Sequence, residues 1–174
     1  MAGANQTEAL ALSHMIAVMN QGRIAQIGTP RDIYERPSDR FVADFVGTTN
    51  FLDAIVLASG GEGGCRVRAA LGDLNVRCVE RLTANDAVVV SVRPEDVELS
   101  EQPQQPTDGD NFYAGTVLAK AFLGDCLDFQ VKIGDLVLLA RVHPSLRTPV
   151  GDTVHVRMRA EKCIAVPHRG REGT

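Results

Sequence analysis

The sequence repeats itself in a fixed order at a nearly fixed spacing. The segment Ala-Ile-Val-Leu-Ala at 54–58 returns as Gly-Thr-Val-Leu-Ala at 115–119, and Gly-Asp-Leu at 72–74 returns at 134–136. Val-Arg-Pro-Glu at 92–95 returns as Met-Arg-Ala-Glu at 158–161, so the three offsets are 61, 62 and 66 residues. An echo of this kind is typical of a duplicated structural unit. It predicts two small barrels rather than one enzyme pocket.

The net charge and the amino-acid composition argue against several classes of partner. The chain has 174 residues and a net charge of −4, whereas binding to a nucleic-acid backbone depends on clustered Lys and Arg. Six Phe, two Tyr and no Trp leave few rings for base stacking. Residues 1–8 are polar and do not resemble a signal peptide, and no apolar run approaches the roughly 20 residues that span a bilayer. We therefore expect no nucleic-acid partner and no direct membrane insertion.

The four cysteines are widely spaced and form no Cys-x-x-Cys pair. They are Cys65, Cys78, Cys126 and Cys163. A metal site or a disulfide is compatible with this spacing, but we expect reduced thiols in a protein core.

The first 50 residues read as a mixture of helix and strand. Residues 6–13 favour a helix, and 16–19 and 23–27 form two short strands around a tight turn at Gly22. Thr29 is expected to cap a short helix that Pro37 ends, and Ser38 to cap a second helix closed by Gly47. In that second helix one apolar face is shared by Phe41, Val42, Phe45 and Val46.

From residue 51 onward the apolar period changes to two, which indicates strands buried on one face. Apolar side chains alternate with polar ones at Cys65, Val67, Ala69 and Leu71, and again at Leu127, Phe129, Val131 and Ile133. The stretch 100–111 is rich in Gln, Pro and Asp and predicts a linker, and 168–174 reads as a polar, disordered tail.

This order of elements resembles the rear part of an ABC-transporter ATPase. Gln-Thr-Glu-Ala-Leu-Ala-Leu-Ser at 6–13, the hairpin and Gly-Thr-Pro at 28–30 look like the end of the ATPase domain and the bridge after it. Phe-Val-Ala-Asp-Phe-Val-Gly at 41–47, Asn-Phe-Leu at 50–52 and Val-Arg-Pro-Glu at 92–95 are similar to the bridge and to the OB-like module called TOBE. The family imports maltose, polyamines, ferric iron and related solutes.

The resemblance implies a mainly β protein with two OB-like units in tandem, preceded by a short α/β remnant. The implied parts are 1–28 (end of the ATPase domain), 29–50 (helical bridge), 51–100 (first unit), 101–111 (linker), 112–167 (second unit) and 168–174 (tail).

The nucleotide-binding motifs of the family do not occur in this sequence. The chain contains no Gly-x-x-x-x-Gly-Lys-Ser/Thr, no Leu-Ser-Gly-Gly-Gln and no strand ending in Asp-Glu. The position of the family's switch histidine is Ala4. Without these groups nothing holds the triphosphate, the metal or the attacking water. We therefore expect no ATPase activity, no catalytic residue, no cofactor and no metal.

The roles that the resemblance implies are regulatory. An intact subunit of this kind dimerises partly through its C-terminal modules and works with membrane permease subunits. It is cytoplasmic and peripheral to the inner membrane. The segment 45–51 is closer to the polyamine, iron and phosphonate branch than to the sugar branch. The hairpin at 16–27 would expose its edges and its apolar face. We therefore expect a homodimer, or an amino-terminal segment that packs against a β unit.

Five residues of the repeated motif are candidates for an interface or structural site. They are Arg93, Pro94 and Glu95 in the first copy and Arg159 and Glu161 in the second. Strand parity places both Arg-x-Glu pairs on the side away from the core, where each strand ends. One interpretation is a link between the barrels or to a partner subunit. The other, which we favour, is a local ion pair at the strand end, worth at most about 1 kcal/mol if it is exposed.

Three other functions are weaker candidates. A small-oxyanion sensor of the TOBE type is the main alternative, although no Ser-Ala-Arg-Asn-like segment occurs. An OB-fold nucleic-acid binder is disfavoured by charge and aromatics. An independent enzyme ranks last, since the sequence assembles no nucleophile with a base. His143 and His155 are expected at the surface, and Gly60 to Gly64 as a hairpin tip.

Overall fold

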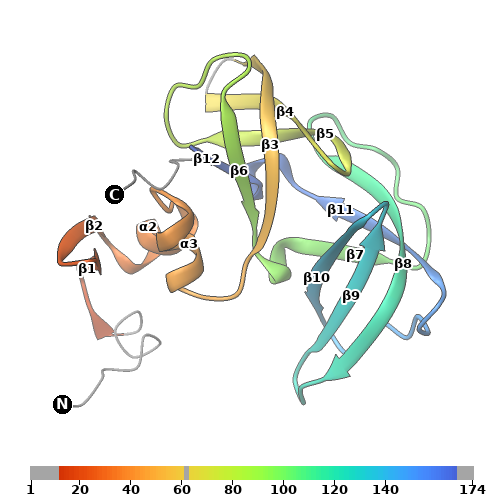
Figure 1. Cartoon of the computed structure of the whole chain (residues 1–174). Helices are drawn as coiled ribbons and strands as arrows, with labels where there is room; N and C mark the ends of the chain where they lie inside the picture. Colours follow the sequence, from red (N-terminus) through yellow and green to blue (C-terminus); the bar gives the residue numbers. More distant parts are fainter. Residues whose placement is uncertain (1–11, 61–62, 168–174) are drawn as a thin grey trace.

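A computed structural model describes residues 12–60 and 63–167. A β-hairpin and a small helical bridge lie beside two larger β-sheets (Figure 1). The helix expected over 6–13 and the tail at 168–174 lie almost wholly outside these ranges. Within them, no helix is long and apolar enough to cross a membrane.

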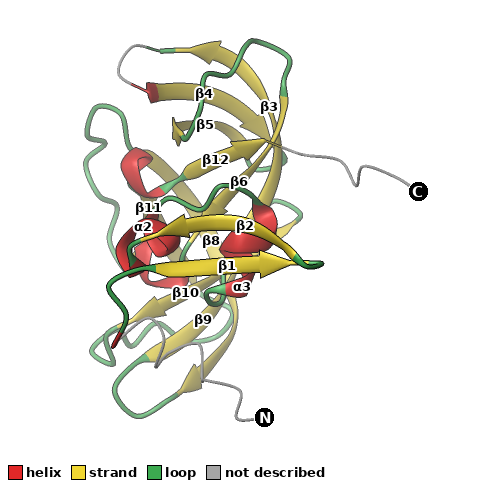
Figure 2. Cartoon of the chain, turned by 90° about the vertical axis from the view of Figure 1, so that its left-hand side faces the viewer, coloured by secondary structure: helices red, strands yellow, loops and turns green. Residues whose placement is uncertain are grey.

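The amino-terminal part is a hairpin packed on two short helices. Strands β1 (Ile16–Asn20) and β2 (Arg23–Gly28) pair antiparallel as expected. Gln21 and Gly22, at φ of 49° and 77°, make the tight turn between them. Figure 2 shows the hairpin lying across helices α2 (Pro30–Glu35) and α3 (Arg40–Phe45). A small separate core forms between hairpin and helices from Val18, Ile33, Val42 and Val46.

Helix α2 begins at the predicted cap, whereas helix α3 begins one residue later than predicted. Thr29 caps α2, with its side chain accepting from the Asp32 amide and the Asp32 carboxylate accepting from the Thr29 amide. The cap of α3 is Asp39 and not Ser38, since the Asp39 carboxylate accepts from the Val42 amide at 2.9 Å. The Ser38 amide donates instead to the Gln26 side chain at 2.8 Å, which ties the bridge to the hairpin.

The first sheet is a closed barrel of five strands in the order β12-β5-β4-β3-β6. The strands are β3 (Asn50–Ser59), β4 (Gly64–Ala69), β5 (Gly72–Cys78), β6 (Ala87–Val92) and β12 (Ile164–Pro167). Strand β6 is buried on both faces, with Val88 and Val90 toward the barrel and Val89 toward Phe51 and Val166.

The second sheet has the order β10-β9-β8-β11-β7 and does not close by hydrogen bonds. Its strands are β7 (Val97–Ser100), β8 (Asn111–Phe122), β9 (Leu127–Ile133), β10 (Leu136–Val142) and β11 (Thr153–Met158). Two 3₁₀ turns, η2 (Pro94–Asp96) and η3 (Ala160–Lys162), separate β6 from β7 and β11 from β12. The expected mainly β, OB-like fold is therefore confirmed, with one barrel closed and one open.

The last strand of each repeat belongs to the sheet of the other repeat. Strand β7 pairs with β11 of the second sheet, and β12 pairs with β6 and β5 of the first. The ranges 51–100 and 112–167 therefore do not each enclose one sheet. The two sheets also share a single core, in which Val67 and Leu74 cluster with Phe129 and Leu138. The physical reason is that the 3₁₀ turns redirect each chain end across the junction.

The cysteines differ from the expectation of four reduced thiols. Cys65 and Cys78 are joined in a disulfide, whereas Cys126 and Cys163 are free. The bond was open as an alternative in the sequence, because spacing alone does not show which strands lie side by side.

Two buried asparagines fasten the sheets together. Asn50, at the start of β3, donates to the carbonyls of Val92 (3.2 Å) and Leu139 (2.8 Å) and accepts from the Leu139 amide (2.7 Å). Asn111, at the start of β8, donates to the carbonyls of Asn75 (2.9 Å) and Met158 (3.1 Å) and accepts from the Asn75 amide (2.7 Å). Each side chain thus bonds to the backbone of both sheets.

Replacing Asn111 by Ala is expected to lower the free energy of unfolding by about 2–4 kcal/mol, because it leaves several buried backbone groups without partners. Urea unfolding followed by circular dichroism measures this change. Asn75→Ala is the matched control, because only the backbone of this exposed residue takes part in the bonds. That control should stay within about 0.5 kcal/mol of the parent. Equal losses in the two variants would contradict the role given to the Asn111 amide.

Candidate functional site

The first copy of the repeated motif holds the helical bridge against the barrel. Arg93 follows the last residue of β6 and precedes η2. Its Nη1 donates to the carbonyls of Gly47 at 2.9 Å and Thr48 at 3.2 Å, and also to the Thr49 hydroxyl. One guanidinium nitrogen therefore binds the whole turn by which the bridge enters β3.

Tyr34 of helix α2 completes this contact. The Arg93 guanidinium carbon lies 4.3 Å from the centre of the Tyr34 ring, which is a cation–π geometry. The Tyr34 hydroxyl donates to the carboxylate of Glu95 on η2. We call Tyr34, Arg93 and Glu95 the bridge clamp, since together they join α2, the 47–49 turn and the end of β6.

Burial sets the electrostatics of the clamp. Arg93 is only 7% exposed, and this burial lowers the pKa of its guanidinium. Burial, followed by the hydrogen bond to Glu95, raises the pKa of Tyr34 from 10.0 to about 12. Because the folded value lies above the unfolded one, the stability that this phenol contributes is complete below pH 10.0 and is lost as the pH rises toward 12.

Arg93 carries one of two buried side-chain atoms that lack a hydrogen-bond partner in the described part of the chain. They are Arg93 Nη2 and Ser38 Oγ. The guanidinium bonds to backbone and hydroxyl oxygens rather than to the Glu95 carboxylate. The local Arg-x-Glu ion pair that the sequence favoured is therefore wrong for the first copy, because the side chain turns inward under the bridge.

The second copy of the motif has the same backbone but a different environment. Arg159 precedes η3 at φ −66° and ψ 134°, close to the −71° and 145° of Arg93. It lies at the surface and pairs with Glu98 of the exchanged strand β7 at 3.0 Å and with Glu161 at 3.7 Å. Here the expected local ion pair does form. No helical bridge covers this copy, so its arginine stays in solvent.

The two motifs also meet each other. Lys162 of η3 lies 3.7 Å from the carboxylate of Asp96 on η2. Burial raises the pKa of Asp96, and the nearby Lys162 opposes this rise. Three of the five candidate residues, Arg93, Glu95 and Glu161, line one cavity of about 350 Å³ between bridge and barrel. The other two do not: Pro94 is buried in η2, and Arg159 faces β7.

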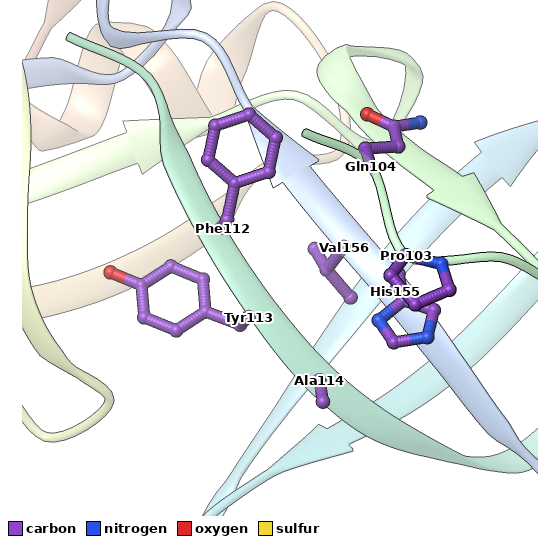
Figure 3. Close-up of a pocket in the computed structure, with 7 residues that line it drawn as sticks. All are labelled: Pro103, Gln104, Phe112, Tyr113, Ala114, His155 and Val156. Atoms are coloured by element: carbon purple, nitrogen blue, oxygen red, sulfur yellow. The ribbon is translucent and has the colours of Figure 1, made fainter. Parts of the chain in front are cut away.

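A second, smaller cavity contains none of the candidate residues. It measures about 170 Å³ and lies between the linker and strands β8 and β11 (Figure 3). Pro103, Phe112 and His155 give it apolar and aromatic walls.

The other histidine considered in the sequence, His143, contacts the Ser145 hydroxyl at 3.0 Å. In residues 12–60 and 63–167, no three His, Cys, Asp or Glu side chains converge on a point where a metal ion could bind.

The asparagines and the tyrosine of these contacts were not among the residues predicted from the sequence. A signal for the asparagines was present, because Asn-Phe at 50–51 returns at 111–112 with an offset of 61 residues. This is the offset of the strand segments that follow it. For Tyr34 no pattern indicates that helix α2 packs beside the end of β6.

Comparison with known proteins assigns the carboxyl-terminal part. The model of the TOBE domain matches residues 90–166. The chain carries a TOBE domain. This domain begins within β6 and therefore includes Arg93, both 3₁₀ turns and the exchanged strands β7 and β12.

The homologues of the chain are spermidine/putrescine import ATP-binding subunits, so the resemblance noted in the sequence is confirmed. The protein PotA 2 of Pseudomonas aeruginosa is 40% identical over 165 residues, covering 89% of this chain and 44% of the relative. PotA 1 of the same organism is 36% identical, covering 93% and 41%. PotA of Ruegeria pomeroyi is 46% identical over 116 residues, covering 64% and 31%. The chain thus spans less than half the length of these curated relatives.

A solved structure shares the arrangement of the TOBE sheets. The molybdate-bound form of ModG, a cytoplasmic molybdate-binding protein, superposes with a TM-score of 0.61. The match covers 76% of this chain and 99% of ModG at 19% sequence identity. At that identity the likeness shows the fold alone.

Replacing Arg93 by Ala is expected to lower the free energy of unfolding by about 2–4 kcal/mol, because three bridge oxygens lose their donor and the Tyr34 ring its cation. Arg159→Ala is the matched control at the equivalent, exposed position and should cost less than about 1 kcal/mol. Urea titration of both variants measures the difference.

The bridge gives a second readout for the same variant. Arg93→Ala should speed trypsin cleavage within residues 29–49, whereas Arg159→Ala should leave the cleavage rate unchanged. Equal sensitivity of the two variants would show that the bridge is held by other contacts.

Proposed function

We propose that this chain is the carboxyl-terminal regulatory and dimerisation region of the ATP-binding subunit of an ABC solute importer. Its cargo would be a polyamine such as spermidine or putrescine, as the names of the relatives state. The observation that carries the proposal is the extent of the similarity. It covers 93% of the chain and so includes the hairpin and bridge as well as the TOBE domain.

The bridge clamp supports a regulatory role. The hairpin and the two helices form one small body with its own core. Arg93 and Tyr34 fasten this body to the barrel through buried contacts. A movement of the hairpin would therefore carry the TOBE sheets with it. In the intact subunit such a connection would link the state of the ATPase domain to the carboxyl-terminal sheets, on the cytoplasmic side of the inner membrane and beside the permease subunits.

As part of this proposal, the chain does not hydrolyse ATP. Its sequence has no phosphate-binding loop, no signature motif and no switch histidine, since that position is Ala4. No cofactor and no metal have a part in the proposed role.

Calorimetric titration of the purified chain with Mg-ATP is expected to show no binding, and incubation should release no phosphate. The reason is that no backbone amide loop with a lysine is available for the phosphates. Saturable binding of ATP would contradict the proposal. The same titration with molybdate, sulfate or phosphate tests the oxyanion-sensor alternative, for which heat of binding would be required.

Dimerisation of the chain is expected to use the outer face of the hairpin. Met19 and Ile24 face each other across the two strands and are each 57% exposed, with Ile27 beside them at 55%. Sedimentation of the parent chain should give a dimer, and Ile24→Lys should shift it to monomer because it places a charge in the apolar contact. Ile55→Lys is the matched control on the barrel, where the side chain is 51% exposed. A monomeric parent chain whose first 28 residues are readily proteolysed would count against this part of the proposal.

A further inference from the structure

The Cys65–Cys78 bond lies at the weakest joint of the closed barrel. Strand β12 pairs with β5 over only two residue pairs, Ile164 with Arg77 and Ala165 with Cys78. One further bond, from the Arg77 amide to the Cys163 carbonyl at 2.8 Å, completes this parallel joint. By contrast β4 and β5 pair over six residues and β12 and β6 over four.

The bond crosses from the first residues of β4 to the last residue of β5. Cys65 opposes Val76 in the register, so Cys78 extends past the end of the pairing with β4. The Cα atoms of the two cysteines are 6.3 Å apart, within the range that disulfides span. Without this bond the last residue of β5, Cys78, has only the short β12 joint to hold it, because the pairing with β4 ends at Arg77. The disulfide therefore prevents fraying of β5 at the position where β12 closes the barrel.

The two cysteines differ in their access to a reagent. Cys65 is 7% exposed and belongs to the barrel core. Cys78 is half-buried and lines a cavity of about 340 Å³ between the bridge and the barrel. Arg36, Arg77 and Glu80 line the same cavity, so two cations and one carboxylate stand beside the path of an incoming thiolate.

We propose that Cys65–Cys78 is a reversible thiol-modification site, attacked at Cys78 by small thiols, and that its reduction opens the β12–β5 joint. In the first step a thiolate bonds to Cys78 Sγ and Cys65 leaves as a thiolate that takes up a proton. In the second step another thiolate attacks the sulfur of the reagent and releases Cys78. The net change is two electrons and two protons onto the protein, and the two small thiols become one disulfide.

The free cysteine beside the joint does not interfere with this exchange. Cys163 is completely buried, and this burial raises the pKa of its thiol to about 12. It therefore stays protonated near neutral pH, and a protonated thiol does not attack a disulfide. Cys126 lies in the β8–β9 connection, in the other sheet. The exchange is thus confined to the pair at the joint.

The test compares the full chain before and after treatment with dithiothreitol. Alkylation under denaturing conditions followed by mass spectrometry should count two free cysteines before reduction and four after it. Hydrogen exchange should then accelerate by at least about tenfold in the peptides covering 74–78 and 164–167, as expected for local opening, and stay unchanged in β8 and β9. Four free cysteines in protein purified without reductant would overturn the proposal. So would equal exchange in the two states.

Two variants distinguish the effect of breaking the Cys65–Cys78 bond from other effects of dithiothreitol on the protein. Cys78→Ser should show fast exchange at the joint with or without dithiothreitol, whereas Cys126→Ser should keep the full response to it. If Cys78→Ser does not fold, the two redox states of the parent chain still decide the question. If Cys126→Ser lost the response of hydrogen exchange to dithiothreitol, the effect would come from Cys126 and not from the Cys65–Cys78 bond. That result would overturn the proposal.

Discussion

The exchange of one strand between the two repeats is the constraint on which the rest of this structure depends. Because β7 completes the second sheet and β12 closes the first, neither repeat can bury its apolar face alone. The 3₁₀ turns η2 and η3 must therefore lie side by side, and Lys162 and Asp96 pair across them. Asn50 and Asn111 then satisfy backbone groups of both sheets at the two ends of the junction.

The two copies of the repeated motif show how one local backbone serves two purposes. Arg93 and Arg159 stand at equivalent places before a 3₁₀ turn. The first is covered by helix α2 and the 47–49 turn, so its charge is buried and bonds to the bridge. The second remains in solvent and pairs with carboxylates. The difference comes from what packs on each copy, because the sequence around the arginines is similar.

Much of the fold could be predicted from local patterns, and the parts that could not share a physical cause. The alternation at Leu127, Phe129, Val131 and Ile133 correctly predicts strand β9, and Gly22 correctly marks the hairpin turn. A period of two shows which face of a strand is buried but not which strand lies beside it. The exchange of β7 and β12 and the disulfide between β4 and β5 therefore escaped prediction.

Arg93 and Glu95 were named as candidates from the sequence, but the contacts that they make differ from the expected ion pair. Strand parity placed Arg93 away from the barrel core, which is correct, and suggested a surface position, which is not. Parity describes one sheet and contains no information about the helical bridge that covers its outer face. Ser38 is also not the helix cap that the sequence predicted: the Asp39 carboxylate accepts from the Val42 amide, and the Ser38 amide bonds to Gln26 of the hairpin.

The position of β12 in the first barrel determines when that barrel can close during translation. A ribosome makes residues 50–92 long before residues 164–167, so the first barrel keeps the outer edges of β5 and β6 unpaired while the second repeat is being synthesised. Both open edges then offer unpaired amides and carbonyls to any neighbouring nascent strand. Closure must wait until almost the whole described chain has been synthesised, and a pause or premature stop in the second repeat leaves the first one unfinished as well.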